Sequence, residues 1–260
     1  KVCIWVTVSW VRIPSSLQKT SNIRFNCFNM RMYYALLSFL LVSTLFAQEK
    51  VATDTIAVDS MYREDQFYTS ITYNNLQHTP TLFTQNKFSP GLSFGFLRDM
   101  PFNNNRTWAI AMGLGYAYSG YNTNLLQTST GNGSIAYQIA PNTTVYSKNK
   151  LTLHYLEVPF EIRWRNSTYK SHRFWRIYSG FKISYLINDK YTFTSDTGDI
   201  TLKNNAALNK ISYGATLMAG WNTWNVYVYY GFNNLFKNTQ VGTESLDLKS
   251  LNIGLQFYIL

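Results

Sequence analysis

The chain has 260 residues and a formal net charge of +10, yet only 14% of its residues are charged while 17% are aromatic. Five of its 23 lysines and arginines lie in the first 47 residues, which leaves 18 basic residues against all 13 acidic ones in the remainder. These basic residues are scattered, whereas a nucleic-acid-binding protein gathers them on one face. The composition therefore argues against a nucleic-acid partner.

The stretch MRMYYALLSFLLVSTLFAQ, which begins at Met30, has the pattern of a secretory signal peptide. A short basic start precedes an apolar run that ends at Phe46 and is followed by the small residue Ala47. Because the run falls short of the roughly 20 apolar residues that a spanning helix needs, a signal peptide is favoured, and a buried helix or an uncleaved anchor is the less favoured alternative. We expect an upstream extension from a start site placed too early (1–29), a signal peptide (30–47) and a polar periplasmic linker (48–65).

Both cysteines, Cys3 and Cys27, precede the expected signal peptide. A mature chain without cysteine has no disulfide, no thiol nucleophile and no cysteine metal ligand. The sequence predicts neither a cofactor nor a metal site.

Large apolar residues occupy every second position in eight segments beyond residue 65. In the third segment, Trp108, Ile110 and Met112 alternate with Ala109 and Ala111. A period of two is typical of β-strands. The segments are, in chain order, 66–73, 91–98, 107–119, 154–165, 173–187, 211–221, 225–232 and 251–260.

The second face of these segments distinguishes a soluble sandwich from a membrane barrel. A soluble sheet is dense in charged residues on its wet face, but here that face is largely Gly, Ala, Ser and Thr. An apolar outer band around a small or polar interior, on strands of about 9–11 residues, is typical of transmembrane β-barrels. Long and short connections alternate, as in barrels with long external loops, short periplasmic turns and periplasmic termini. We expect residues 66–260 to form an all-β, eight-stranded antiparallel barrel in the outer membrane.

Five tryptophans fall near the expected short turns. Tryptophan is enriched where a membrane meets water, so we expect these residues to form an interfacial aromatic belt at one end of the barrel. They are Trp108, Trp164, Trp175, Trp221 and Trp224.

The segment HYLEVPFEIRWR (154–165) places ions on the inward face of the barrel. It is joined by a short turn to the segment 173–187, so the two pair antiparallel. The expected register puts Glu161 opposite Arg176 or one step diagonal from it, and Glu157 opposite Gly180 or Lys182. We expect a lumen cluster made by Glu157, Glu161, Arg163, Arg176 and Lys182.

Two interpretations of this cluster remain open. The favoured one is a plug of paired ions, because an eight-stranded barrel has an interior just wide enough for side chains and a buried charge is costly unless it is paired. The other is a pathway for ions or substrate. Pro159 shares this face without changing the alternation, so we expect a missing hydrogen bond there and not a bulge.

Catalytic candidates are few. The three histidines fall at separate places, and His154 alone faces the lipid side, where a hydrolase acting on outer-leaflet lipid would keep its base. A lone histidine at a strand end is more often a polar interfacial residue. We therefore predict no catalytic residue, and we keep a lipid-modifying enzyme and a barrel that binds or adheres through its loops as alternatives.

Four stretches together resemble the PorT family of Bacteroidetes outer-membrane proteins: HYLEVPFEIRWRNS, FWRIYSGFKISYLI, YGATLMAGWNTWNVYVYYGFN and the closing LNIGLQFYIL. The similarity runs in the same order from about Phe67 to Leu260. It implies a component required by the type IX secretion system, which exports surface proteins and is linked to gliding motility, and it implies no catalytic residues. The expected partners are outer-membrane lipid, other secretion components and the outer-membrane assembly machinery.

Overall fold

The computed structural model describes residues 64–259 apart from positions 86, 104, 132–133, 142, 167–174 and 197. The expected upstream extension and signal peptide, and all but the last two positions of the expected linker, lie outside the described residues. Within the described part of the chain, no helix is long and apolar enough to cross a membrane.

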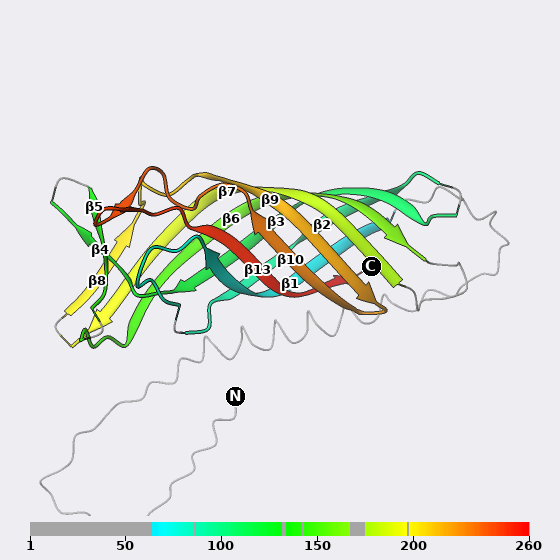
Figure 1. Ribbon diagram of the computed structural model, residues 1–260. Helices are drawn as coiled ribbons and strands as arrows, with labels where there is room; N and C mark the ends of the chain where they lie inside the picture. The colour runs from blue at the N-terminus through cyan, green and yellow to red at the C-terminus, as the bar shows by residue number, and fades with distance from the viewer. Residues whose placement is uncertain are drawn as a thin grey trace, which may run out of the picture. The chain divides into compact units, whose positions relative to one another are not determined.

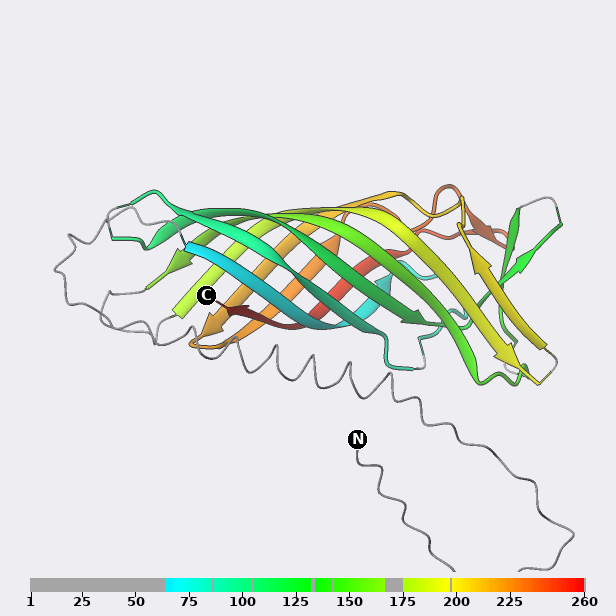
Figure 2. The same ribbon diagram turned by 180° about the vertical axis from the view of Figure 1, so that it is seen from behind.

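Eight antiparallel strands form a closed barrel (Figures 1 and 2). Each strand pairs with the neighbouring barrel strands in chain order, and β1 pairs with β13 to complete the ring. This confirms the predicted eight-stranded architecture, and each predicted segment overlaps one strand. The barrel strands are β1 (Glu64–Gln77), β2 (Pro90–Pro101), β3 (Trp108–Asn122), β6 (Lys148–Arg165), β7 (Trp175–Ser195), β9 (Ile211–Trp221), β10 (Trp224–Gly231) and β13 (Lys249–Ile259).

The connections differ in length at the two ends of the barrel, as the sequence predicts. The long connections, 78–89, 123–147, 196–210 and 232–248, share one end, here called the loop end. The short ones, 102–107, 166–174 and 222–223, share the other, the turn end. Which end faces the cell exterior remains a prediction.

Additional short strands lie at the loop end. β8 (Gly198–Lys203) extends the sheet beside β7, and two hairpins form within the long connections. In Figure 1, β4, β5 and β8 lie together at one extremity of the barrel. The hairpins are β4 (Leu125–Ser129) with β5 (Ile135–Ile139), and β11 (Gln240–Val241) with β12 (Glu244–Ser245).

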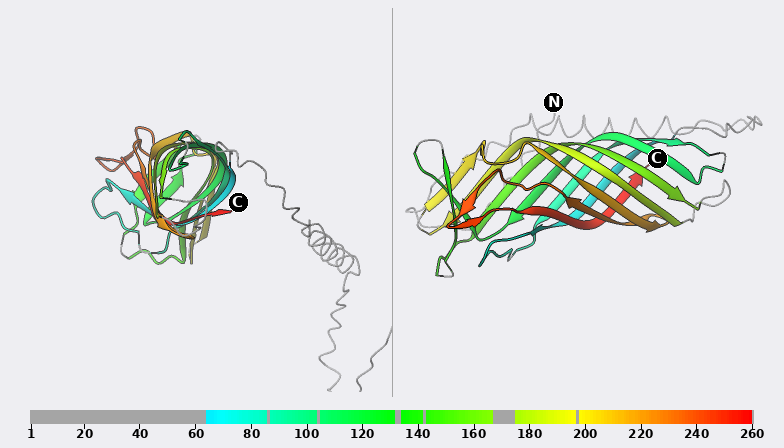
Figure 3. Two further views of the ribbon diagram at one scale, coloured as in Figure 1. Left: turned by 90° about the vertical axis from the view of Figure 1, so that its right-hand side faces the viewer. Right: turned by 45° about the horizontal axis from the view of Figure 1, so that its top comes forward.

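Successive residues of each barrel strand point alternately to the outer wall and into the lumen. On β6, Leu156, Val158 and Phe160 are exposed on the outer wall, while Glu157 and Glu161 are buried inside. The ring of strands seen end-on in the left panel of Figure 3 has no open edge. Closure satisfies the backbone hydrogen bonds of every barrel strand, which is a requirement for a sheet that sits in lipid.

At the loop end the inward face becomes apolar. Side chains from the barrel strands, β4, β5 and the long connections pack together there into a cluster that we call the apolar cap. The cap is a hydrophobic core of the kind found in soluble proteins, and it lies inside the mouth of the barrel. Its buried members include Leu76, Tyr121, Leu125, Tyr137, Leu151, Leu153, Tyr155, Leu186, Tyr191, Phe193, Leu208, Leu235, Phe236, Leu246 and Leu248.

One irregularity interrupts the pairing of β6 with β7. His154 lies opposite Asn188 and Tyr155 lies opposite Leu186, so Ile187 is an extra residue on β7. The register passes unbroken through Pro159, which lies opposite Lys182. The predicted absence of a bulge at this proline is confirmed, and the bulge lies nearer the loop end.

Candidate functional site

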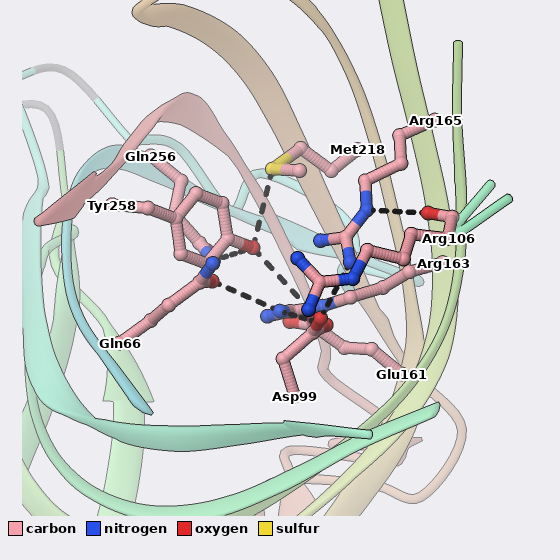
Figure 4. A network of polar contacts seen from close by, with 9 residues as sticks. All are labelled: Gln66, Asp99, Arg106, Glu161, Arg163, Arg165, Met218, Gln256 and Tyr258. Atoms are coloured by element: carbon pink, nitrogen blue, oxygen red, sulfur yellow. Dashed lines mark hydrogen bonds and ion pairs between the residues drawn. The ribbon is translucent and has the colours of Figure 1, made fainter. Parts of the chain in front are cut away.

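Arg163 is the centre of a network of ions inside the turn end of the barrel (Figure 4). Its guanidinium lies 2.8 Å from Oδ1 of Asp99 and 2.8 Å from Oε2 of Glu161. It also donates a hydrogen bond of 2.9 Å to Oε1 of Gln66. Arg163 is fully buried, so these acceptors replace the water that the charge would otherwise bind.

Arg165 extends this network toward the turns. Its Nη2 lies 2.9 Å from Oδ2 of Asp99, and its Nε donates to the backbone oxygen of Arg106 at 2.8 Å. Asp99 is therefore shared by two arginines, one on each carboxylate oxygen. Two carboxylates and two guanidiniums balance, which leaves this group without net charge.

A second ion pair lies one step further toward the loop end. Nζ of Lys182 is 2.9 Å from Oε2 of Glu157, and the hydroxyl of Tyr68 donates to Oε1 of Glu157 at 2.7 Å. The ammonium also lies 4.6 Å from the ring centroid of Tyr229 and 5.6 Å from that of Tyr227. A cation over an aromatic face gains electrostatic stabilisation where water is excluded. We call the six residues of the two groups the ion cluster: Asp99, Glu157, Glu161, Arg163, Arg165 and Lys182.

Small residues on β3 make room for these long side chains. Ala111 lies opposite Glu161, and Gly115 lies opposite Glu157. A Cβ atom added to Gly115 would collide with the hydroxyl of Tyr68, the group that donates to Glu157. The glycine is thus required by the close approach of a side chain from β1, which lies two strands away in the barrel.

The structure brings together four of the five residues that the sequence proposed for the lumen. Glu157, Glu161, Arg163 and Lys182 meet inside, but Arg176 lies at the turn end and donates to the backbone oxygen of Asn222 at 2.7 Å. The expected register is wrong: Glu161 lies opposite Gly180, and Arg176 lies opposite Arg165. The alternation of the two strands fixes which residues share a face but not the register, which in a hairpin also depends on the turn.

Asp99 and Arg165 were missed as members of the cluster. Asp99 lies one position past the predicted end of the second segment, yet it continues the inward series of Gly91, Ser93, Gly95 and Leu97. Extending that alternation by one more step would have found it. Arg165 follows the same parity as Arg163 on β6, so the signal was present for both residues.

Between the Lys182–Glu157 pair and the apolar cap lies a small polar cavity. Its volume is about 40 Å³, and Ser70, Ser93 and Ser119 line it together with Tyr121 and Tyr155 of the cap. A cavity holds one water for roughly each 10–15 Å³ measured this way, so a few waters fit there and a polypeptide does not. The ion cluster closes the lumen on one side of this cavity and the cap on the other.

The five tryptophans form a row around the outside of the turn end. Trp108 lies opposite Trp164, and Trp221 lies opposite both Trp175 and Trp224. The rings of Trp175 and Trp221 are 5.1 Å apart. The row extends over β3, β6, β7, β9 and β10, and its position in the membrane interface remains a prediction.

His154 lies on the outer face of β6, near the loop end. Its Nδ1 forms a hydrogen bond with the hydroxyl of Tyr116, and its ring contacts that of Tyr118. Among the described residues, no group of three or more His, Cys, Asp or Glu side chains could hold a metal ion.

The sequence matches the family described as "Outer membrane protein beta-barrel domain" over residues 46–237. The chain belongs to this family. A search among curated proteins finds no match. One solved structure with a detectable similarity is that of Ail, the attachment invasion locus protein of Yersinia pestis, in complex with the heparin analogue sucrose octasulfate. It is 14% identical, covers 75% of this chain and 99% of Ail, and superposes with a TM-score of 0.28. Membership of the family places this chain among outer-membrane β-barrels.

Proposed function

We propose that this protein is a non-enzymatic outer-membrane component of the type IX secretion and gliding machinery, and that it serves assembly, docking or stabilisation and not passage. The machinery is suggested by the resemblance of its strand sequences to the PorT family. The restriction to a non-passage role rests on one observation, the filled lumen.

Side chains fill the lumen along the barrel axis on both sides of one small cavity. The ion cluster occupies the turn end, the polar cavity of about 40 Å³ follows, and the apolar cap occupies the loop end. Breaking a buried ion pair costs about 3–5 kcal/mol, and opening the cap would expose its apolar side chains to water. Transport through the lumen would require both, so partners must act on outer surfaces.

The loop end offers the larger of these surfaces. β8 and the two hairpins extend the structure beyond the barrel wall, and their outward side chains are available to other secretion components. The last strand in the sequence, β13, pairs with β1 to close the barrel. In this proposal the outer-membrane assembly machinery recognises that last strand during insertion.

An export assay tests the secretion role. A strain lacking the gene is expected to retain type IX cargo in the periplasm, and a plasmid copy of the wild-type gene is expected to restore surface delivery. Normal surface delivery in the deletion strain would refute the proposal.

Electrical recording tests the non-passage part separately. The purified protein in a planar lipid bilayer is expected to give no steady ion conductance. A stable open channel would contradict a filled lumen while leaving a role in secretion intact.

Loop-mediated binding at the cell surface is the second candidate, because the loop end carries an open, partly apolar hollow. Its volume is about 480 Å³, and it lies between Leu82, Ile139 of β5 and the β11–β12 hairpin. Leu82 is 78% exposed and has a φ of 64°, a backbone conformation that costs energy in a bulky residue. In this case Leu82→Ser would impair attachment to a surface ligand while cargo export continues.

A further inference from the structure

A group of lysines lies on the outer wall of the barrel near the loop end, where β6, β7 and β8 run side by side (Figure 2). Lys148 and Lys150 belong to β6, Lys190 to β7 and Lys203 to β8. All four share the outward face, because their neighbours in sequence, such as Leu151 and Tyr191, point into the apolar cap. We call these four residues the lysine wall.

The lysines are arranged as close neighbours. Lys190 lies directly opposite Lys203, and Thr152 lies opposite Lys190 on the other side. Lys150 follows two positions from Thr152 on the same face. Like charges directly opposite each other destabilise a sheet, so this arrangement favours binding of an anion between them.

The protein itself supplies little to neutralise this charge. Asp196 lies exposed in the turn that joins β7 to β8. On the outer face of the three strands themselves, Asp199 is the single carboxylate among the described residues, and it lies opposite Thr194 at the tip. No ion pair joins it to the four lysines within the described part of the chain. The Lys150 ammonium lies 5.4 Å from the ring centroid of Tyr118. Hydroxyl groups of Thr152, Thr192 and Thr201 lie between the lysines and add hydrogen-bond donors.

The lysine wall begins just above the apolar outer wall. Leu156 and Ile187 are the last exposed apolar residues of β6 and β7, and Lys190 follows Ile187 by three positions. A strand advances about 3.3 Å per residue, which puts Lys190 roughly 10 Å along the strand from the hydrocarbon edge. Headgroups occupy a layer of about 5–8 Å on each side of the hydrocarbon core, and a tilted strand crosses that layer over this distance. Lys190, with Lys203 directly opposite it, is therefore at the height of lipid headgroups, and Lys150 and Lys148 lie farther out along β6.

We propose that the lysine wall binds the phosphate groups of a glycolipid headgroup in the outer leaflet, with the acyl chains lying against the apolar outer wall below. Clustered ammonium groups bind phosphate as point charges, and the threonine hydroxyls complete the hydrogen bonding. The occupant is a lipid because the charged surface continues directly into the lipid-facing surface of the same strands. The assignment requires an outer-membrane barrel whose loop end faces the cell exterior, and it is independent of the proposed secretion role.

Two matched triple variants test the assignment. The first is Lys150→Gln, Lys190→Gln and Lys203→Gln on the lysine wall. The second is Lys210→Gln, Lys237→Gln and Lys249→Gln, which lie elsewhere at the loop end. Each removes three positive charges from two exposed lysines and one half-buried lysine, so the change in net charge and exposure is the same. Folding of each variant is checked by the heat-dependent gel mobility of barrels.

The measurement is native mass spectrometry of the full protein, purified from outer membranes and titrated with lipid A. Each lysine near an anionic surface is worth about fivefold in affinity, so the first variant is expected to bind roughly 100-fold more weakly than wild type. The second is expected to stay within about threefold of wild type, since none of its lysines belongs to β6, β7 or β8. Lipid A without phosphates is expected to bind to wild type as weakly as lipid A binds to the first variant.

Three outcomes would overturn the assignment. Equal losses in the two variants would mean that net charge alone attracts the lipid. Undiminished binding of dephosphorylated lipid A would mean that the acyl chains alone are held. Inorganic phosphate or a soluble sulfated polysaccharide that binds wild type as tightly as lipid A does would show that the wall takes soluble anions and not a membrane lipid.

Discussion

The inward face of β6 is ionic at the turn end and apolar at the loop end. Glu161 and Arg163 lie in the ion cluster, whereas Leu151 and Leu153 lie in the apolar cap, although all four share one face of one strand. The outer face changes in the opposite sense, from Ile162 to Lys150. The same strand therefore has an apolar outer face and a polar inner face at the turn end, and the reverse at the loop end.

The difference follows from the medium outside the wall. Where lipid surrounds the barrel, apolar side chains gain little by turning inward, so the lumen is filled by polar groups that must satisfy one another. Where water surrounds the loop end, burial of apolar surface is again favourable and an ordinary core forms. The two halves should therefore respond differently to the same kind of substitution.

The largest expected effect is at the centre of the ion cluster. Arg163→Ala leaves Asp99 and Glu161 buried without their shared cation, and it should lower the free energy of unfolding by about 3–5 kcal/mol. The measurement is urea unfolding in lipid vesicles, followed by tryptophan fluorescence. Arg98→Ala is the control, because Arg98 and Asp65 form an exposed pair at 3.9 Å, and it should cost less than about 1 kcal/mol. Equal losses would show that the ion cluster adds nothing beyond a surface pair.

The next effect compares the two halves directly. Leu153→Gln introduces an amide into the apolar cap and should cost about 3 kcal/mol. Lys182→Met combined with Glu157→Gln replaces an ion pair of the lumen by neutral groups of similar size and should cost less than about 1.5 kcal/mol. Lys182→Met alone should cost about 3 kcal/mol, since it strands the Glu157 charge. If the double variant proves no more stable than Lys182→Met alone, the loss in the single variant does not come from the unpaired charge of Glu157.

A smaller effect concerns the room that β3 leaves inside the barrel. Gly115→Ala should displace Tyr68 from Glu157 and cost about 1–3 kcal/mol, as overpacking of a filled interior does. Gly120→Ala on the same strand is the matched control, because its new methyl group would meet the flexible end of Lys150 and the Tyr118 hydroxyl at 3.0 Å or more, whereas that of Gly115→Ala would meet the Tyr68 hydroxyl at a much shorter distance. The same unfolding assay measures both. A neutral Gly115→Ala would mean that the lumen is more loosely packed than the contacts indicate.

The smallest effect is a pH dependence at the loop end. The Thr81 side chain and backbone amide hydrogen-bond to Glu244 and lower the pKa of its carboxyl below the ordinary value of 4.5. This contact is therefore fully present above pH 4.5 and is lost as the pH falls below it through the lowered pKa. The amide shift of Thr81 in NMR spectra should report the loss, and Glu244→Gln should remove the titration. A titrating shift in that variant would assign it to another group.

Much of the barrel could be predicted from local alternation. Each wall residue faces one of two media, so the sequence around Trp108 and Ile110 already identifies an outer and an inner face. The placement of Glu157 near Lys182 also followed, because residues of one face on adjacent strands are neighbours even when the register is off by a step or two. The contact of Asp99 with Arg163 did not follow, since it joins strands that are not neighbours in the barrel.

The sequence by itself determined the number of barrel strands, the side of the wall on which their side chains lie, and the alternation that places the long loops at one end of the barrel. These properties depend on the medium beside each residue and on spacing along the chain. Only the tertiary structure decided the register of β6 with β7, the sharing of Asp99 by two arginines, and the closure of the lumen by the apolar cap. Those features depend on turn geometry and on the curvature that brings distant strands across the lumen into contact, and neither is encoded in any one segment.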